Sequence, residues 1–586
     1  MKTIYIVIMT FIALLSSHWA WSQNFILGAD VSWSTEMESS GRKLYDFNGK
    51  ECETFSLMKG AGITAVRLRV WVDPSKHGNW SCKEDVLKKA LRAKALGLDI
   101  MVDFHYSDWW ASSSAQNIPE AWKKHKYKQL LTDVKNHTTE VLNLLKQNDI
   151  SVKWIQIGNE ISNGMLWSVK MDDTTGNPVK DENGNTIITQ DMGHIGTHPQ
   201  QYAGFFNAGY EAAKSVYPDS KIIVHLDNEF DSSQYDRNLD ILKDNGVQWD
   251  IIGLSLYPYR AKKYEENTNK LFAEYVRSIK SLYKKYGTDA MIVETGFEVD
   301  EKRPWLMESG RTQLKELIRL MKTATEGHCR GVFYWEPTCD PSKYNLGAFT
   351  TDGHPTSIMR AITTAALDEE LAISPEARKN IVYDRPRIRF KTSEGDIVME
   401  LYNETPKHRD NFIDIIERGV LDSTLFHRVL SDFMIQGGDP ESKEAEKTDA
   451  DFPAPQLGYN SAVDAEGKPY TIAAEIIYPT AFCKRGAVCA ARDGDETNPE
   501  RKSSSSQFFI VWGKWPAGRK EGSRVSPLPY YKESRQPGLP ALDGDYTVFG
   551  EVIQGLDVVE RIQKLRTDKH DRPLKDVRIL KANIIR

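Results

Sequence analysis

The stretch WIQIGNE, residues 154–160, is an alternating apolar run that ends on an asparagine and a glutamate. Such alternation predicts a β-strand with the Asn-Glu pair at its carboxyl end. Seven further short runs rich in β-branched residues lie between residues 25 and 337, and amphipathic stretches separate them. The eight runs are FILGADVS, AVRLRVW, DIMVDFH, WIQIGNE, KIIVHLD, IIGLSLY, AMIVETG and GVFYWEP.

Helices are expected between these strands. Apolar residues recur near helical period from Val86 to Ala95, and Gly97 follows where a C-cap is expected. A second helix is predicted from Leu130 to Leu145. Eight strands alternating with helices over about 310 residues favour a (β/α)8 TIM barrel over an open doubly wound sheet.

A barrel of this kind carries its chemistry at the carboxyl ends of its strands. Nearly all of the predicted strand ends are polar or aromatic: Asp30, Arg69, His105, Asn159, Glu160, Asp227, Tyr257, Glu294, Trp335 and Glu336. Glu160 ends the fourth run and Glu294 the seventh. Two carboxyl groups facing each other suit glycoside hydrolysis, in which a retaining enzyme places them about 5 Å apart as nucleophile and acid.

Residues 23–366 resemble glycoside hydrolase family 53, the endo-β-1,4-galactanases. The resemblance rests on GADVSW, RLRVWVDP, DFHYSDWWA, IGNEISNGMLW, IIGLSLYP, ETGF, GVFYWEP and LGAFTTDGHP. It implies Glu160 as acid/base, Glu294 as nucleophile, and a β-1,4-galactan type polysaccharide as substrate.

The resemblance also implies sugar-binding residues. Asn159 would bond the sugar 2-OH, and Arg69 and Tyr257 would lie beside Glu294 and keep it ionised. Trp335 would be the platform under the sugar, and His105, Asp108, Trp109 and Trp110 would line neighbouring subsites.

Several alternatives remain open for the barrel. Glu336 is a rival carboxylate, although Pro337 follows it. Related barrels cleave mannan, xylan or glucan with the same glutamate pair. The stretch DENGNT lacks the spacing of a calcium loop and is interpreted as a turn-rich loop, and calcium binding is left open. No metal ligand and no cofactor are assigned.

The first 22 residues predict a secretory signal peptide. Lys2 precedes an apolar run from Ile4 to Leu15, and small residues follow before Gln23. The run is short of the roughly twenty residues that a membrane anchor needs. Export to the periplasm or the extracellular space is therefore expected. A net charge of −6 without a dense basic block argues against a nucleic-acid partner.

Six cysteines are too few for a disulfide-dense scaffold, but an oxidising compartment permits pairs. Cys329 with Cys339 and Cys483 with Cys489 are candidates, and free buried thiols are the alternative.

Residues 367–386 are charged and irregular and predict a linker with one short helix. RIRFKTSEGDIVMELY, residues 387–402, then predicts a hairpin, and KHRDNFIDIIERG, residues 407–419, a helix closed by its last glycine.

Residues 387–586 resemble the cyclophilin family of peptidyl-prolyl isomerases, through TLFHRVLSDFMIQGGDP, SSSSQFFIVWG and ALDGDYTVFGEVIQGLDVVERI. The resemblance implies a mainly-β, closed eight-stranded antiparallel barrel capped by helices, with proline-containing peptides or proteins as partners. Rotation about an X-Pro bond faces a barrier of about 20 kcal/mol, which a guanidinium aimed at the proline nitrogen lowers by weakening the amide resonance.

On the family pattern Arg428 is that guanidinium, and His427 is a packed neighbour. The implied peptide-binding residues are Phe433, Met434, Gln436, Ala491, Gln507 and Phe509. Ala541 stands where many members carry Trp, and Tyr546 where the usual pocket His stands. A charged insertion, residues 513–538, precedes that strand. A domain that binds peptide as a chaperone without isomerase activity is therefore the alternative.

Overall fold

The computed structural model describes residues 25–585 apart from 173–174, 176, 228–231, 262–267, 374, 383–384, 446–460, 515–527 and 534–535. The predicted signal peptide lies outside the described residues, as does most of the charged insertion. The chain divides into two compact units, one holding a parallel barrel and the other an antiparallel sheet.

Within the described residues, eight parallel strands close into a barrel in the order β1-β10-β9-β8-β7-β4-β3-β2. They are β1 (Ile26–Asp30), β2 (Ala65–Val70), β3 (Asp99–Phe104), β4 (Trp154–Ile157), β7 (Lys221–Leu226), β8 (Ile251–Leu256), β9 (Asp289–Thr295) and β10 (Cys329–Trp335). Each coincides with one of the eight predicted runs. The predicted (β/α)8 architecture is confirmed.

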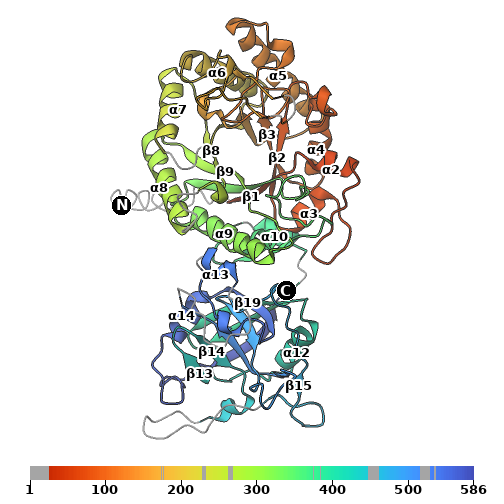
Figure 1. The fold of residues 1–586 in the computed structure, drawn as a ribbon, viewed down its shortest axis with the longest axis vertical. Helices are drawn as coiled ribbons and strands as arrows, with labels where there is room; N and C mark the ends of the chain where they lie inside the picture. The colour runs from red at the N-terminus through yellow and green to blue at the C-terminus, as the bar shows by residue number, and fades with distance from the viewer. Residues whose placement is uncertain are drawn as a thin grey trace, which may run out of the picture. The chain divides into compact units, whose positions relative to one another are not determined.

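Helices ring these strands (Figure 1). They are α2 (Ser34–Ser39), α3 (Thr54–Gly60), α4 (Lys83–Ala95), α5 (Tyr127–Gln147), α6 (Pro199–Val216), α7 (Ser232–Asp244), α8 (Thr268–Tyr286), α9 (Pro304–Thr323) and α10 (Ser357–Leu367). The two helices predicted in detail are α4 and α5. Gly97 follows α4 at φ +68°, a conformation that glycine adopts without steric cost.

Large apolar side chains fill the barrel away from its mouth. The cluster consists of Ile26, Ala65, Met101, Trp154, Ile223, Ile251, Met291, Val293 and Phe333. Gly28 is required beside it, because a Cβ there would lie 2.2 Å from the ring of Phe333. A barrel filled in this way is a packed core, which leaves only the loop-lined ends for chemistry.

A short hairpin, β5 (Ser168–Val169) and β6 (Ile188–Gln190), lies in the long loop after β4. The linker contains one short helix, α11 (Pro375–Asn380), as predicted. None of the described helices is long and apolar enough to cross a membrane.

The second unit is built on an eight-stranded antiparallel sheet in the order β13-β14-β18-β16-β19-β12-β11-β20. The strands are β11 (Arg387–Thr392), β12 (Gly395–Leu401), β13 (Arg428–Leu430), β14 (Met434–Gly437), β16 (Ala487–Ala490), β18 (Phe508–Val511), β19 (Val548–Gln554) and β20 (Ile579–Ile585). The strand pair β15 (Thr471–Ile472) and β17 (Ser503–Ser504) lies apart from it. The helices are α12 (Pro406–Glu417), α13 (Pro529–Glu533) and α14 (Leu556–Gln563).

The closure of this sheet into a barrel is less complete than predicted. Among the described residues, β13 and β20 form no ladder with each other. The chain just before each of them makes the closure, through a bridge between Leu425 and Arg578. The N–H of Phe426 donates to the carbonyl of Val577 at 2.9 Å beside this bridge. The result is a barrel with one short seam.

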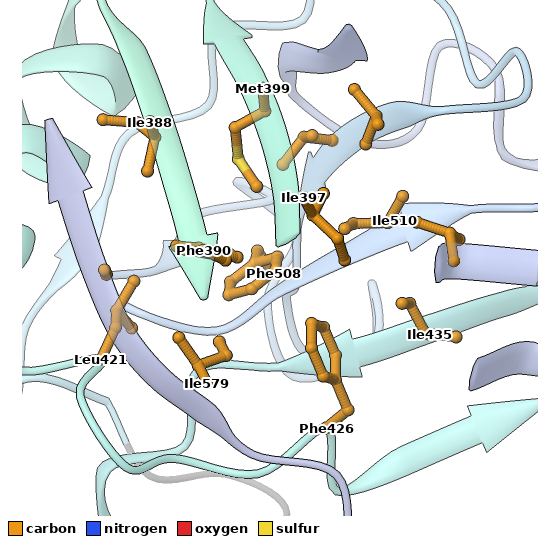
Figure 2. Packing of buried hydrophobic residues seen from close by; sticks show 14 of the residues in the cluster. Ile388, Phe390, Ile397, Met399, Leu421, Phe426, Ile435, Phe508, Ile510 and Ile579 are labelled. Atoms are coloured by element: carbon orange, nitrogen blue, oxygen red, sulfur yellow. The ribbon is translucent and has the colours of Figure 1, made fainter. Parts of the chain in front are cut away.

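Figure 2 shows the interior of this unit. Side chains from β11, β12, β14, β18 and β20 converge on Phe508, and Leu421 and Phe426 enter from the loop after α12. All of these side chains are almost fully buried. The alternating pattern of RIRFKT directs Ile388 and Phe390 inward, so the predicted hairpin supplies two of the core strands.

Candidate active sites

The two glutamates of the predicted acid pair meet over β8. Ser255, in β8, donates a hydrogen bond of 2.9 Å from Oγ to Oε1 of Glu160. Tyr257, two residues on, donates one of 2.9 Å from its hydroxyl to Oε2 of Glu294. Residues two apart along a strand face the same side. The two carboxyl groups therefore occupy neighbouring positions at the barrel mouth.

The backbone at the end of β4 turns sharply to present Glu160. Gly158 has φ +80°, and Glu160 itself has φ +47° and ψ +55°. A non-glycine residue in this left-handed region is uncommon, and such strain concentrates at functional sites. The Asn159-Glu160 pair after β4 thus lies in a tight turn that holds Glu160 in place.

Arg67 is the cation that pairs with Glu294. Its Nη1 lies 2.8 Å from Oε1 of Glu294 and 2.8 Å from Oδ2 of Asp30, and its Nη2 lies 2.9 Å from Oδ2 of Asp103. The guanidinium is almost fully buried. A buried arginine needs such partners, because an unpaired charge in the interior is costly.

The expectation that Arg69 lies beside Glu294 is wrong. Arg67 and Arg69 share one face of β2, so the sequence pattern alone fits either residue. In the structure Arg67 pairs in register with Asp30, and Arg69 lies nearer the mouth. Its guanidinium carbon lies 4.1 Å from the ring centre of Trp110 and 4.5 Å from that of Trp71, and its Nη1 is 3.5 Å from Oε1 of Glu336.

The surroundings of the two glutamates push their pKa values in the same direction to different extents. Burial raises the pKa of Glu160 well above its usual value, and the carboxyl groups of Asp227 and Glu294 add to the rise. Burial also raises the pKa of Glu294, but Arg67 and the Tyr257 hydroxyl oppose the rise. Glu160 is therefore the better proton carrier, and Glu294 is the group more readily ionised.

Asn159 is held by the protein on both sides of its amide. Its Oδ1 accepts from Nη2 of Arg67 at 2.8 Å, and its Nδ2 donates to the carbonyl of Ala111 at 2.8 Å. An amide NH2 carries two hydrogens. One N–H of Asn159 thus has no bond among the described residues and is available to a sugar hydroxyl.

His105 and Asp108 are engaged in holding the loop after β3. Nε2 of His105 donates to Asp103 at 2.9 Å, and its Nδ1 accepts from the N–H of Ala111 at 3.2 Å. The two oxygens of Asp108 accept from the N–H groups of Asp73 and Glu120. These contacts favour a supporting role for both residues, and direct sugar binding by them stays a prediction.

Aromatic side chains gather beside the glutamates. Trp335 lies 5.2 Å from Trp33, 5.8 Å from Trp110 and 4.8 Å from Tyr344, measured between ring centres. Trp109 stacks on His77 at 3.7 Å and meets Trp71 at 4.4 Å with the ring planes tilted by 36°. Trp335 thus lies among aromatic side chains, with Trp33 and Tyr344 as neighbours that were not predicted from the sequence, and its role as the sugar platform stays a prediction.

The second unit contains a pocket of about 950 Å³. It is lined by all seven residues predicted for the prolyl peptide site: Arg428, Phe433, Met434, Gln436, Ala491, Gln507 and Phe509. Nε2 of Gln436, in β14, donates to Oε1 of Gln507, the residue before β18, at 3.0 Å. A pocket of this size and mixed lining suits a short peptide.

Arg428 is half exposed at the rim of this pocket, with Asp571 3.5 Å from its Nε. His427 is buried, and burial lowers its pKa to about 4, which agrees with a packed, uncharged neighbour. Tyr546 meets Phe509 edge to face at 5.4 Å, and the guanidinium of Arg492 lies 4.7 Å from its ring centre. The substitution at this position therefore preserves an aromatic wall. Ala541 does not line the pocket.

Each of the two units matches a known protein family. Residues 26–366 match the family described as glycosyl hydrolase family 53. The chain belongs to this family. Residues 387–584 match the family described as cyclophilin type peptidyl-prolyl cis-trans isomerase. Both are families of enzymes.

The matches to relatives of the family 53 barrel cover most of each relative's own length. An uncharacterized protein of Niallia circulans is 32% identical over 349 residues, which cover 56% of this chain and 87% of that one. A probable arabinogalactan endo-beta-1,4-galactanase A of Neosartorya fischeri is 30% identical over 332 residues, 53% of this chain and 83% of that one. A solved family 53 catalytic domain of Ignisphaera aggregans is 26% identical, covers 58% of this chain and 96% of its own, and has a TM-score of 0.49.

Inward polar residues of the family 53 barrel were missed from the sequence, among them Arg67, His225 and Ser255. Each lies two residues before a predicted strand end, at Arg69, Asp227 and Tyr257 respectively. Residues of one parity face the barrel interior together. Polar residues at that spacing inside an apolar run were the available signal.

Proposed function

We propose that this chain is an exported bifunctional enzyme. Its barrel hydrolyses β-1,4-galactosidic bonds within (arabino)galactan with retention, and its second unit isomerises X-Pro bonds. The observation that carries the first activity is the pair Glu160 and Glu294, held side by side over β8 by Ser255 and Tyr257. The choice of galactan is supported by the family match and by the printed name of the Neosartorya fischeri relative.

In the first half-reaction, Glu294 attacks the anomeric carbon while Glu160 protonates the departing glycosidic oxygen. Arg67 and Tyr257 keep Glu294 ionised for the attack, since both stabilise its carboxylate. Asn159 donates its remaining N–H to the 2-OH, a contact that strengthens as positive charge develops on the sugar ring.

In the second half-reaction, Glu160 is left as a carboxylate and removes a proton from water, which then attacks the glycosyl-enzyme and releases Glu294. Trp335 supports the apolar face of the sugar during both steps. Its position within 6 Å of Trp33, Trp110 and Tyr344 gives a continuous aromatic surface beside the carboxyl pair.

The isomerase proposal rests on the seven predicted residues that line one pocket. Phe433, Met434 and Phe509 hold the proline ring, and Gln436 and Gln507 bond the peptide backbone. The guanidinium of Arg428 at the rim is free to approach the proline nitrogen, where it weakens the amide resonance that makes unassisted isomerisation slow.

Export is proposed from the first 22 residues, whose charge and apolar run match a signal peptide. Mass spectrometry of protein secreted from the expressing cell tests it: a mature chain beginning at Gln23 is expected, and an uncleaved Met1 contradicts the proposal.

Sugar release from β-1,4-galactan, mannan, xylan and β-glucan tests the first activity. Cleavage of galactan alone is expected, and cleavage of mannan, xylan or glucan without galactan would replace the proposed substrate. Exchange of a proline-containing peptide, with Arg428→Ala as control, tests the second. Equal rates for the two proteins would favour a peptide-binding chaperone.

A further inference from the structure

We propose that His225 and Ser255 form a closed hydrogen-bonded ring with Glu160 that places the acid proton on Oε2. The inference rests on the proposed role of Glu160 as acid/base. It makes His225 and Ser255 positioning residues, which act through Glu160 and do not touch the substrate. Three contacts define the ring, and each is fixed by which atom is able to donate.

The first contact determines the tautomer of His225. The backbone N–H of Glu160 points at Nδ1 of His225 at 3.2 Å, and a backbone N–H only donates. Nε2 of Gln156 also points at this nitrogen, at 3.0 Å. The Gln156 amide is oriented by Arg67, whose Nε donates to its Oε1 at 3.2 Å. One hydrogen of this amide is given to Oδ1 of Asp103, which leaves the other for Nδ1. Oδ1 of Asn159 also lies 3.1 Å from Nδ1, but it already accepts from Nη2 of Arg67. A proton on Nδ1 would face the backbone N–H of Glu160, which is unable to accept, so we assign Nδ1 as unprotonated.

The second contact follows from the first. In the neutral imidazole the proton then lies on Nε2, which is 2.9 Å from Oγ of Ser255. Burial lowers the pKa of His225 well below its usual value, and the nearby Arg67 adds to this, so the ring stays neutral. Nε2 therefore donates to Ser255.

The third contact closes the ring. Because Oγ of Ser255 accepts from His225, its single hydrogen is directed to Oε1 of Glu160 at 2.9 Å. Oε1 is thus held as an acceptor and is unsuited to carry the acid proton. The proton that Glu160 delivers must lie on Oε2, the oxygen left free for the glycosidic oxygen.

The ring also lowers the pKa of Glu160 through the hydrogen bond from Ser255. The charged groups that face it are Asp227 and Glu294, which disfavour its carboxylate, and Arg260, which favours it. Ser255 is a neutral donor to the carboxylate and acts in the same direction as Arg260. His225 and Ser255 are fully buried, so no solvent competes with these bonds.

Ser255→Ala tests the ring in the full chain, with Ser255→Thr as the matched variant that keeps the hydroxyl. Loss of the donor raises the pKa of Glu160, so the basic limb of the pH profile of kcat/KM for galactan moves to higher pH. We expect kcat to fall about 10- to 100-fold, the worth of one hydrogen bond to a charged group. Ser255→Thr is expected to keep both the position of the basic limb and kcat close to those of the unsubstituted chain.

A substrate with a reactive leaving group separates acid assistance from general damage. An aryl β-galactoside whose phenol leaves without protonation needs no acid in its first step. Ser255→Ala is therefore expected to slow galactan cleavage much more than the formation of the glycosyl-enzyme from this substrate. Equal loss on both substrates, with the pH limb unmoved, would overturn the proposal.

A readout without turnover covers the case in which galactan is not the substrate. Ring-¹⁵N histidine labelling of the full chain, assigned with His225→Gln, reports the protonation of each ring nitrogen. His225 is expected as the neutral Nε2–H form throughout the range in which an ordinary histidine titrates, and Ser255→Ala is expected to shift its Nε2 signal. A proton on Nδ1, or ordinary titration, would overturn the ring whether or not galactan is cleaved.

Discussion

Tyr257 donates a hydrogen bond of 2.9 Å to Oε2 of Glu294, whose other oxygen lies 2.8 Å from Arg67. Both carboxylate oxygens of the proposed nucleophile are therefore held by donors from the protein. The attacking group is fixed in direction, and the two donors favour its ionised form against burial and the carboxylates of Asp103 and Asp30, which raise its pKa.

Tyr257→Phe is expected to move the acid limb of the galactan pH profile upward. The hydroxyl stabilises the carboxylate of Glu294, so its loss raises the pKa of Glu294, and ionisation then requires a higher pH. We expect kcat/KM below the new limb to fall about 10-fold or more, since a hydrogen bond to a charged group is removed. An unmoved acid limb would show that Tyr257 does not control this ionisation.

Arg67→Met is expected to destabilise the barrel by about 3–5 kcal/mol, because it leaves buried carboxylates without their cation. Asp30, Asp103 and Glu294 each lie within 3 Å of the guanidinium. Chemical unfolding of the full chain, followed by tryptophan fluorescence, measures the change. Arg67→Met is also expected to move the acid limb of the galactan pH profile upward, because Arg67 lowers the pKa of Glu294. Arg69→Met is the matched variant: it loses aromatic contacts but is expected to leave this limb in place. Equal effects of the two changes on that limb would contradict the assignment of Arg67.

Arg428→Ala is expected to slow the exchange of a proline-containing peptide about 10- to 100-fold. The guanidinium is the charged donor at the rim of the pocket, and a charge-assisted bond is worth this factor. Galactan release by the same preparation reports only on the barrel, so thermal unfolding of the full chain is used to check that the second unit is folded.

Tyr546→His is expected to leave the exchange rate within a few-fold, because Tyr546 serves as a wall against Phe509. A large gain in rate on this change would show instead that Tyr546 impairs the site.

The six cysteines are free in the structure, and four of them, Cys329, Cys339, Cys483 and Cys489, are buried. Sγ of Cys483 lies 3.8 Å from Sγ of Cys489, whereas Cys329 and Cys339 contact different backbone carbonyls. Native alkylation is expected to label Cys52 and Cys82 before the other four, and unfolding is expected to expose all six. A mass two hydrogens lower, with Cys483 joined to Cys489, would contradict free thiols in the exported chain.

The barrel could be predicted from the sequence because its strands are separated by helices and each strand is a short apolar run of its own. WIQIGNE and KIIVHLD stand out even without partners, because each is a short run dominated by apolar residues and lies between amphipathic helical stretches. The closure of the second unit could not be predicted in the same way. It depends on contacts between segments far apart in the chain, such as the bridge between Leu425 and Arg578, which are 153 residues apart.

Candidate site residues could be predicted at the carboxyl ends of the strands but not further inside the barrel. Glu160, Glu294, Tyr257 and Trp335 end their runs and meet at the mouth. Arg67 was mistaken for Arg69 because both obey the same alternation, and only the register of β1 against β2 shows which one reaches Glu294. His225 and Ser255 were missed because a hydrogen-bonded ring is a property of three strands together.

Sugar release from β-1,4-galactan by the intact chain and by its Glu294→Gln variant is the sharpest test of the proposal that the barrel cleaves galactan with Glu294 as nucleophile. The change removes the nucleophile but keeps its size and a partner for Tyr257. We expect galactan cleavage by the intact chain and its loss in the variant, with Glu160→Gln strongly impaired as well. Galactan left uncut by the intact chain, or cut equally well by Glu294→Gln, would contradict it.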